Sequence, residues 1–171
     1  YDSYLIPSLI PIDSKYTDEQ IRDALDAMFA AHPVLTMHVA IRDGVPYMEK
    51  GDKPAVMKGS LNPLKILSLM TSGFDLYSSL SRHIIVRIPG RCYLLSVIHH
   101  LIFDRISLNV FYRHFLRTLE GASLDFVDDH FLTISSFHQE VRSTEQYAEM
   151  DKYIRTMLGN LSEACFYRNP D

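Results

Sequence analysis

The sequence predicts an α/β protein in which helices pack on a mixed or antiparallel sheet, as in an α+β two-layer sandwich. Short β-branched segments bounded by Gly, Pro and Asp alternate along the chain with longer segments of helical periodicity. Two of the helical segments begin with capping boxes. The 171 residues suffice for one domain with its own core, and 47% of them are apolar against 22% charged, as in ordinary globular proteins.

The first strand is expected at residues 3–12, where Pro7 and Pro11 remove two amide donors and so favour the edge of a sheet. A capping box at residues 17–20 starts a helix, which stops before Pro33.

Two further strands are expected at residues 34–41 and 45–48, joined by a turn at Asp43 and Gly44. The interrupted segment 49–57 is interpreted as a loop, and a short helix is expected after it, at residues 62–70.

A hairpin with its turn at residues 89–91 joins strands expected at residues 82–88 and 92–98. With Ser107 as the expected N-cap, the next helix presents one broad apolar face and ends before Gly121. That face consists of Leu108, Phe111, Tyr112, Phe115, Leu116 and Leu119.

The last part of the chain is expected to hold a helix at residues 133–142 and, after a capping box at residues 143–146, a final helix. The apolar stripe of the final helix consists of Tyr147, Met150, Ile154, Met157, Leu158 and Leu161. We assign the aromatic residues of this stripe, like those of the preceding apolar face, to the core.

Composition excludes several classes of function. A formal charge of −4 and a pI near 6.0 give no general reason to bind nucleic acid or acidic lipid. No apolar stretch has the roughly 18 residues needed to span a bilayer, and no export signal is recognisable, so we expect a cytoplasmic protein without membrane contact. Cys92 and Cys165 are too few for a disulfide framework and are expected to be reduced thiols.

One polar cluster lies between the strand at 92–98 and the helix at Ser107. His99 and His100 should point in opposite directions if strand pairing continues to the end, and Asp104 follows in the turn. Such a junction suits proton-transfer chemistry, although the same residues also occur as satisfied polar groups. A metal site is not expected, because adjacent strand histidines do not easily share one ion and no third ligand has suitable spacing.

The HHLIFD segment resembles the HHxxxDG signature of condensation domains of nonribosomal peptide synthetases and of chloramphenicol-acetyltransferase-like enzymes. Segments on both sides resemble the family in the same order, and the similarity runs along nearly the whole chain. These segments are HPVL at 32–35, DGVP at 43–46, FDL at 74–76 followed by Leu80 and Arg82, and the helical stretch 131–158.

The resemblance implies that residues 1–171 form the amino-terminal lobe of a two-lobed domain, with the second lobe absent. It implies amide formation between a carrier-bound donor thioester and an acceptor amine, with His100 catalytic and with His99 and Asp104 shaping the site. The phosphopantetheine would belong to partner carrier proteins, so the lobe itself would bind no cofactor or metal. The lobe alone is expected to be inactive.

Two departures from the family pattern affect these expectations. The resemblance also implies that the histidine motif lies in a tunnel between the two lobes. Arg105 replaces the glycine after the aspartate, and with Ser107 it is interpreted as a residue that modifies this tunnel. A positive φ at this position would make a long side chain costly. Thr36 aligns with the arginine that usually pairs with the aspartate, so Asp104 is expected to lack that partner. A stand-alone acyltransferase and a degenerate, non-catalytic carrier-docking domain are the alternative functions.

Overall fold

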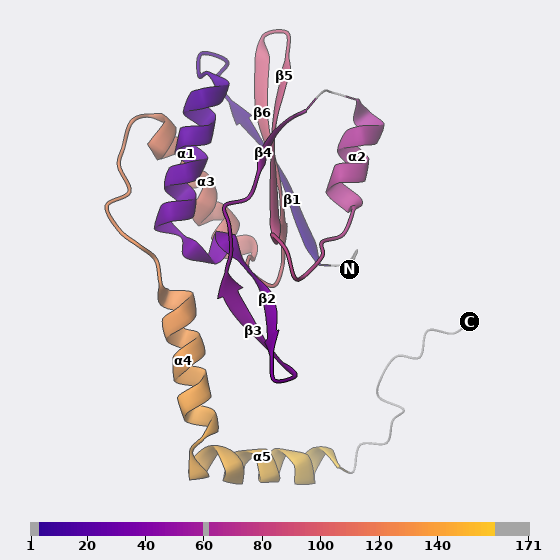
Figure 1. The fold of residues 1–171 in the computed structure, drawn as a ribbon, viewed down its shortest axis with the longest axis vertical. Coiled ribbons are helices and arrows are strands. Elements are labelled where there is room, and N and C mark those ends of the chain that lie inside the picture. Colours follow the sequence, from indigo (N-terminus) through magenta and orange to yellow (C-terminus); the bar gives the residue numbers. More distant parts are fainter. Residues whose placement is uncertain (1–3, 60–61, 160–171) are drawn as a thin grey trace, which may run out of the picture. The chain divides into compact units, whose positions relative to one another are not determined.

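The computed structural model describes residues 4–59 and 62–159, which divide into two compact units, Tyr1–Asp129 and His130–Asp171. The first unit holds a mixed four-stranded sheet with helices, so the predicted fold class is confirmed (Figure 1). None of the described helices is long and apolar enough to cross a membrane.

The sheet has the order β1-β6-β5-β4, from strands β1 (Leu5–Ile12), β4 (Val56–Gly59), β5 (Ser81–Ile88) and β6 (Arg91–His99). Strand β6 pairs antiparallel with both β1 and β5, and β4 pairs parallel with β5. Strand β1 lies at an edge, as its prolines predict.

Helices α1 (Asp18–Ala31) and α3 (Arg105–Leu119) lie together on one face of the sheet (Figure 1). The capping box predicted for α1 is present, because Thr17 accepts from the Gln20 amide and the Gln20 side chain accepts from the Thr17 amide. Of the apolar face predicted for α3, Phe111, Phe115 and Leu119 are buried. Tyr112 is 39% exposed and lies at the margin.

The other face of the sheet is partly covered by α2 (Pro63–Thr71) and by the segment that follows it. The Arg82 guanidinium holds the end of α2, because it donates to the carbonyl oxygens of Leu69, Ser72 and Gly73 at 2.8, 3.4 and 3.3 Å. The guanidinium also lies 4.7 Å from the centre of the buried Phe74 ring. Arg82 therefore joins α2 to β5.

The region after α1 differs from the prediction in three ways. Residues 33–36 form a 3₁₀ turn, η1 (Pro33–Thr36), so β2 (Met37–Arg42) starts later than expected. Strand β3 (Val45–Lys50) is longer than expected. The segment interpreted as a loop, residues 49–57, also includes the first two residues of β4 (Val56–Gly59). The turn itself is as predicted, since Asp43 and Gly44 have φ of 51° and 78°.

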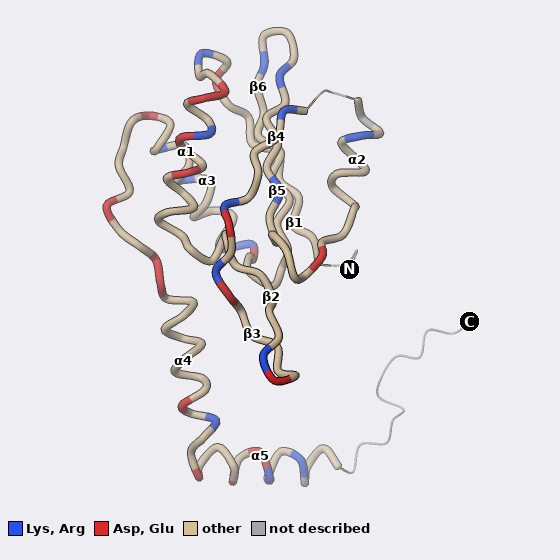
Figure 2. Tube along the Cα trace, in the orientation of Figure 1, with Lys and Arg blue, Asp and Glu red and all other residues tan. Residues whose placement is uncertain are grey.

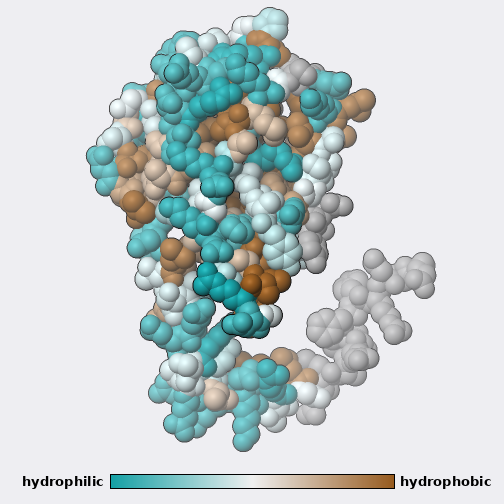
Figure 3. Space-filling view, viewed as in Figure 1, coloured by the Kyte–Doolittle hydropathy of each residue, from teal (hydrophilic) through white to brown (hydrophobic). Residues whose placement is uncertain are grey.

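The hairpin of β2 and β3 forms a separate two-stranded sheet. Ile41 and Val45 are 54% and 63% exposed there, and brown spheres mark a hydrophobic patch near this hairpin (Figure 3). Apolar atoms contribute much of the accessible surface of folded proteins, so a small exposed patch of this kind is normal.

One charged cluster ties three elements of the first unit together. Asp18 at the start of α1 pairs with Lys58 of β4 at 2.8 Å and with Arg87 of β5 at 2.5 Å. Hydrogen bonds from these two cations hold the pKa of Asp18 below its usual value. Elsewhere the charged residues lie mainly on helices, loops and strand ends, and the centre of the sheet is nearly free of them (Figure 2).

The second unit contains α4 (His130–Arg142) and α5 (Glu145–Leu158). Helix α5 is capped by Thr144, one residue later than the expected capping box implies. Neither helix has a buried residue, so the assignment of the final stripe to a core is wrong within this chain. Met150, Ile154 and Met157 are 59%, 44% and 60% exposed, and Leu161 lies outside the described residues.

The two cysteines lie in different parts of the chain. Cys92 is a buried free thiol at the start of β6, as expected. Burial raises the pKa of this thiol, which keeps it protonated and unreactive. Cys165 lies outside the described residues.

A histidine lies fully buried in the core between the sheet and the two helices. His83 is 0% exposed, and its ring nitrogens contact the hydroxyls of Ser96 at 2.9 Å and Ser81 at 3.2 Å. The rings of Phe29 and Phe111 pack against it at 5.4 and 5.9 Å between centroids. Burial lowers the pKa of His83 to about 3, so the ring is neutral at pH 7.

This burial predicts a specific loss of stability in acid. The folded pKa of about 3 lies below the unfolded value near 6.5, so in this range the unfolded chain binds the proton more tightly. The stabilisation is complete above pH ~6.5 and falls by up to about 1.4 kcal/mol per unit as the pH drops toward 3. The free energy of unfolding, measured with urea at several pH values between 7 and 5, should depend less steeply on pH for His83→Gln than for the unchanged chain. Exposed His138→Gln is the control, and equal slopes in all three proteins would contradict the assignment.

The contacts of Arg82 give a second prediction. Arg82→Met keeps the aliphatic stem but leaves the carbonyl groups at the end of α2 without their donor, so the free energy of unfolding should fall by about 2 kcal/mol. Arg91→Met, at an exposed position of the β5–β6 hairpin, serves as the matched control and should change it by less than about 0.5 kcal/mol. Chemical unfolding measures both, and equal effects of the two substitutions would refute the capping role.

Candidate functional site

The junction between β6 and α3 is held by the backbone on two sides. The His99 amide donates to the carbonyl of Leu80 at 2.8 Å, and the His100 amide donates to the carbonyl of Tyr4 at 2.7 Å. Residues on either side of β6 thus fix consecutive amides. The position of the His100 backbone is set by the sheet rather than by a free loop.

The His99 side chain closes the turn that ends β6. It is 7% exposed, and its Nδ1 accepts a hydrogen bond from the Leu101 amide at 3.1 Å. The His99 carbonyl accepts from the Ile102 amide at 3.1 Å. Burial lowers the pKa of His99 and so favours the neutral ring, whose hydrogen must then lie on Nε2 because Nδ1 is the acceptor.

The His100 side chain is exposed. The sequence predicted that alternation would send the two histidines to different environments, and one is indeed buried and the other open. No described residue forms a hydrogen bond with the His100 ring. Large apolar side chains close to it in sequence or in the sheet are also open to solvent, with Leu101 44%, Ile106 73% and Tyr4 74% exposed. The imidazole is therefore available to a bound molecule.

Asp104 is the N-cap of α3. Its Oδ1 accepts from the Ser107 amide and from the Ser107 hydroxyl, both at 2.7 Å. These two hydrogen bonds hold the pKa of Asp104 below its usual value, with a smaller contribution from the Ile106 amide. The prediction that Ser107 is the N-cap is wrong, because the aspartate three residues earlier reaches the free amides first.

The two departures from the family pattern cause neither the backbone strain at residue 105 nor the buried unpaired carboxylate at residue 104 that the sequence suggested. Arg105 is the exposed first residue of α3, and among the described residues other than glycine only Tyr4 and Asp43 have a positive φ. The backbone at Arg105 therefore requires no glycine. Thr36 is buried and donates to the Pro33 carbonyl, while Asp104 is exposed and so is not a buried carboxylate without a partner.

Neither Arg82 nor Arg91 takes the place of the family's arginine as a partner of Asp104. Arg82 binds the end of α2, and Arg91 begins β6 at the end opposite to His99.

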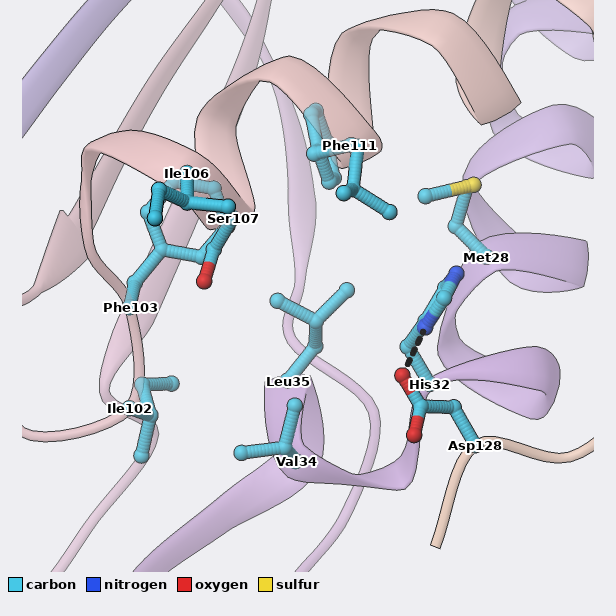
Figure 4. A pocket seen from close by; sticks show the side chains of 11 residues that line it. Met28, His32, Val34, Leu35, Ile102, Phe103, Ile106, Ser107, Phe111 and Asp128 are labelled. Carbon is cyan, nitrogen blue, oxygen red and sulfur yellow. Dashed lines mark ion pairs between the residues drawn. The ribbon is translucent and has the colours of Figure 1, made fainter. Parts of the chain in front are cut away.

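A cavity of about 150 Å³ lies beside the junction, between α1, η1 and α3 (Figure 4). Ile102, Phe103, Ile106 and Ser107 line it from the motif side, and His32 and Asp128 form its polar end. Among the described residues no group of His, Cys, Asp or Glu has the arrangement of a metal site. The polar side chains of the described residues at this junction are the imidazoles of His99 and His100, the carboxylate of Asp104 and the hydroxyl of Ser107.

Sequence reasoning missed the pairing of His32 with His114. Their Nε2 and Nδ1 atoms lie 3.0 Å apart. The residues are 82 positions apart in the sequence, and neither position carries a motif that would have indicated the contact.

The chain is similar to known proteins both in sequence and in structure. No model of a protein family matches the chain. Tyrocidine synthase 3 of Brevibacillus parabrevis is 22% identical over 167 residues, which are 93% of this chain and 3% of that protein.

Three solved structures illustrate the structural similarity. The starter condensation domain of rhizomide synthetase RzmA matches with a TM-score of 0.76 at 14% identity, over 94% of this chain and 43% of that one. The first condensation domain of the calcium-dependent antibiotic synthetase matches with a TM-score of 0.66 at 18% identity, over 94% and 43%. The structure of a condensation domain that mediates chain release from the enacyloxin polyketide synthase matches with a TM-score of 0.74 at 17% identity. The match covers 95% of this chain and 35% of that one. The chain spans less than half of these structures and has the fold of one lobe of a condensation domain.

Proposed function

We propose that the chain is the amino-terminal lobe of a condensation domain, in which His100 assists amide formation between a carrier-bound donor thioester and an acceptor amine. The observation that supports this most strongly is the exposed His100 between the buried His99 and the helix-capping Asp104, in a chain with the fold of one condensation-domain lobe. The HHLIFD segment thus forms a local structure in which a single imidazole is left open.

The chemistry of the reaction suits an exposed imidazole. Attack of an amine on a thioester carbonyl forms a tetrahedral oxyanion and, until a proton leaves, a cationic nitrogen. The His100 ring has two possible roles here: it accepts that proton, or it stabilises the cation electrostatically. No covalent intermediate with the protein is needed, since both reactants are tethered and positioned.

The partners in this proposal follow from the reaction. Carrier proteins bring donor and acceptor on phosphopantetheine arms, and the lobe itself holds no cofactor. A second lobe completes the tunnel around His100. The exposed side chains of Tyr4, Leu101 and Ile106 would then lie at an interface rather than in solvent.

One observation still favours the alternative function, a non-catalytic carrier-docking domain. Thr36 stands where the family has an arginine, so Asp104 gains no guanidinium partner from that position. Arg105 no longer supports this alternative on backbone grounds, because its helical conformation suits any residue.

The catalytic role predicts that His100→Ala in the complete domain lowers turnover in a carrier-loaded condensation assay by about 10²-fold or more. His138→Ala, at an exposed histidine of α4, is the matched control and should leave turnover within about 3-fold. Unchanged folding of both proteins by circular dichroism excludes a structural cause. If His100→Ala turns over as fast as the unchanged domain, His100 is not the catalytic residue.

The role of Asp104 predicts a difference between two substitutions. Asp104→Ala should lower the free energy of unfolding by about 1 kcal/mol, because the first turn of α3 loses its cap. Asp104→Asn should cost much less, since asparagine caps helices about as well as aspartate. Urea unfolding distinguishes them, and an equal loss in both variants would mean that the carboxylate charge rather than the cap stabilises the helix.

A further inference from the structure

Residues 120–129, which join α3 to α4, are fastened to the end of α1. We call this segment the strap. Gly121, with φ of 92°, ends α3 at one end of the strap. At the other end the Asp128 amide donates to the Ala31 carbonyl at 2.7 Å. A single backbone hydrogen bond of this kind is weak, so the side chains around it decide how firmly the strap is held.

Three titratable side chains meet at this point. His32 Nδ1 lies 3.4 Å from Asp128 Oδ2, and His32 Nε2 lies 3.0 Å from His114 Nδ1. The Phe126 ring packs edge-on against both imidazoles, with centroids 5.4 Å apart in each case. We call His32, His114, Phe126 and Asp128 the clamp. It joins the strap to α1 and α3 together.

The geometry of the clamp limits the number of protons it can hold. With both rings neutral, His114 Nδ1–H donates to His32 Nε2, and His32 Nδ1–H donates to Asp128. With one added proton, His32 carries hydrogens on both nitrogens and donates to Asp128 and to His114. With two added protons, an N–H of each ring faces the other across 3.0 Å, and the contact becomes repulsive.

The surroundings of the clamp also oppose the second proton. His32 is 6% exposed, and burial lowers its pKa although Asp128 acts in the opposite direction. For His114, burial is again the first cause of a lowered pKa, followed by the charges of His32, Arg113 and Arg117. Asp128 is the acidic group that offsets them. Because the folded clamp binds protons more weakly than free histidines, acid favours the open state.

We propose that the clamp is an acid-released latch, which holds the strap against α1 at neutral pH and frees it when both histidines are protonated. Asp128 and His32 form the polar end of the cavity beside the candidate site, where Figure 4 shows them joined by a dashed line. Release of Asp128 removes part of the cavity wall, so acid opens the cavity at that end. This inference does not depend on condensation activity.

Native-state hydrogen exchange of the Asp128 amide tests the latch in the full chain. From pH 7 to pH 5 the protection factor of Asp128 should fall at least about 10-fold more than that of the Leu94 amide in β6. Leu94 corrects for changes in global stability, including those caused by His83. A fall no larger than that of Leu94 would overturn the proposal.

A variant separates proton uptake from packing. His114→Phe keeps an aromatic ring against Phe126 but removes the second proton site. It should keep the pH 7 protection of Asp128 within about 5-fold and abolish the extra loss at pH 5. His138→Phe, outside the clamp, should behave like the unchanged chain. If His114→Phe is too unstable to measure, His114→Gln replaces it, and an unchanged pH dependence in the variant measured would refute the latch.

Discussion

The site depends on the hydrogen bond that the Leu101 amide donates to Nδ1 of His99. This contact, with the bond between the Ile102 amide and the His99 carbonyl, ends β6 in a tight turn. The turn leaves His100 at the surface and brings the chain to Asp104, which starts α3. A buried imidazole thus acts as a structural acceptor so that its neighbour can remain free. The two adjacent histidines therefore have different structural environments, one buried and one exposed.

Much of the fold was predictable because its signals are local. The capping box at Thr17, the turn at Asp43 and Gly44, and the prolines of β1 each act within a few residues. Strand β4 was missed because it has four residues and is stabilised by a parallel pairing with β5 about 27 positions away. Pairings of this kind leave little trace in a short segment.

The site was predicted in part, for a related reason. The motif gave the positions of the two histidines, and alternation along β6 gave their different environments. The motif did not show that Asp104 caps α3, or that the backbone at Arg105 is helical. Pairs such as His32 with His114 depend on how α1 packs against α3, and the sequence contains no signal for that contact. The exposed stripe of α5 shows the opposite limit, because periodicity predicts an apolar face but not what covers it.

The central claim is that His99 is a neutral hydrogen-bond acceptor that positions His100. Nitrogen-15 NMR of the histidine rings at pH 7 tests it most directly, because the chemical shifts distinguish a protonated from an unprotonated ring nitrogen. We expect one hydrogen on Nε2 of His99 and none on Nδ1. A hydrogen on Nδ1 of His99, or a doubly protonated His99 ring, would contradict it.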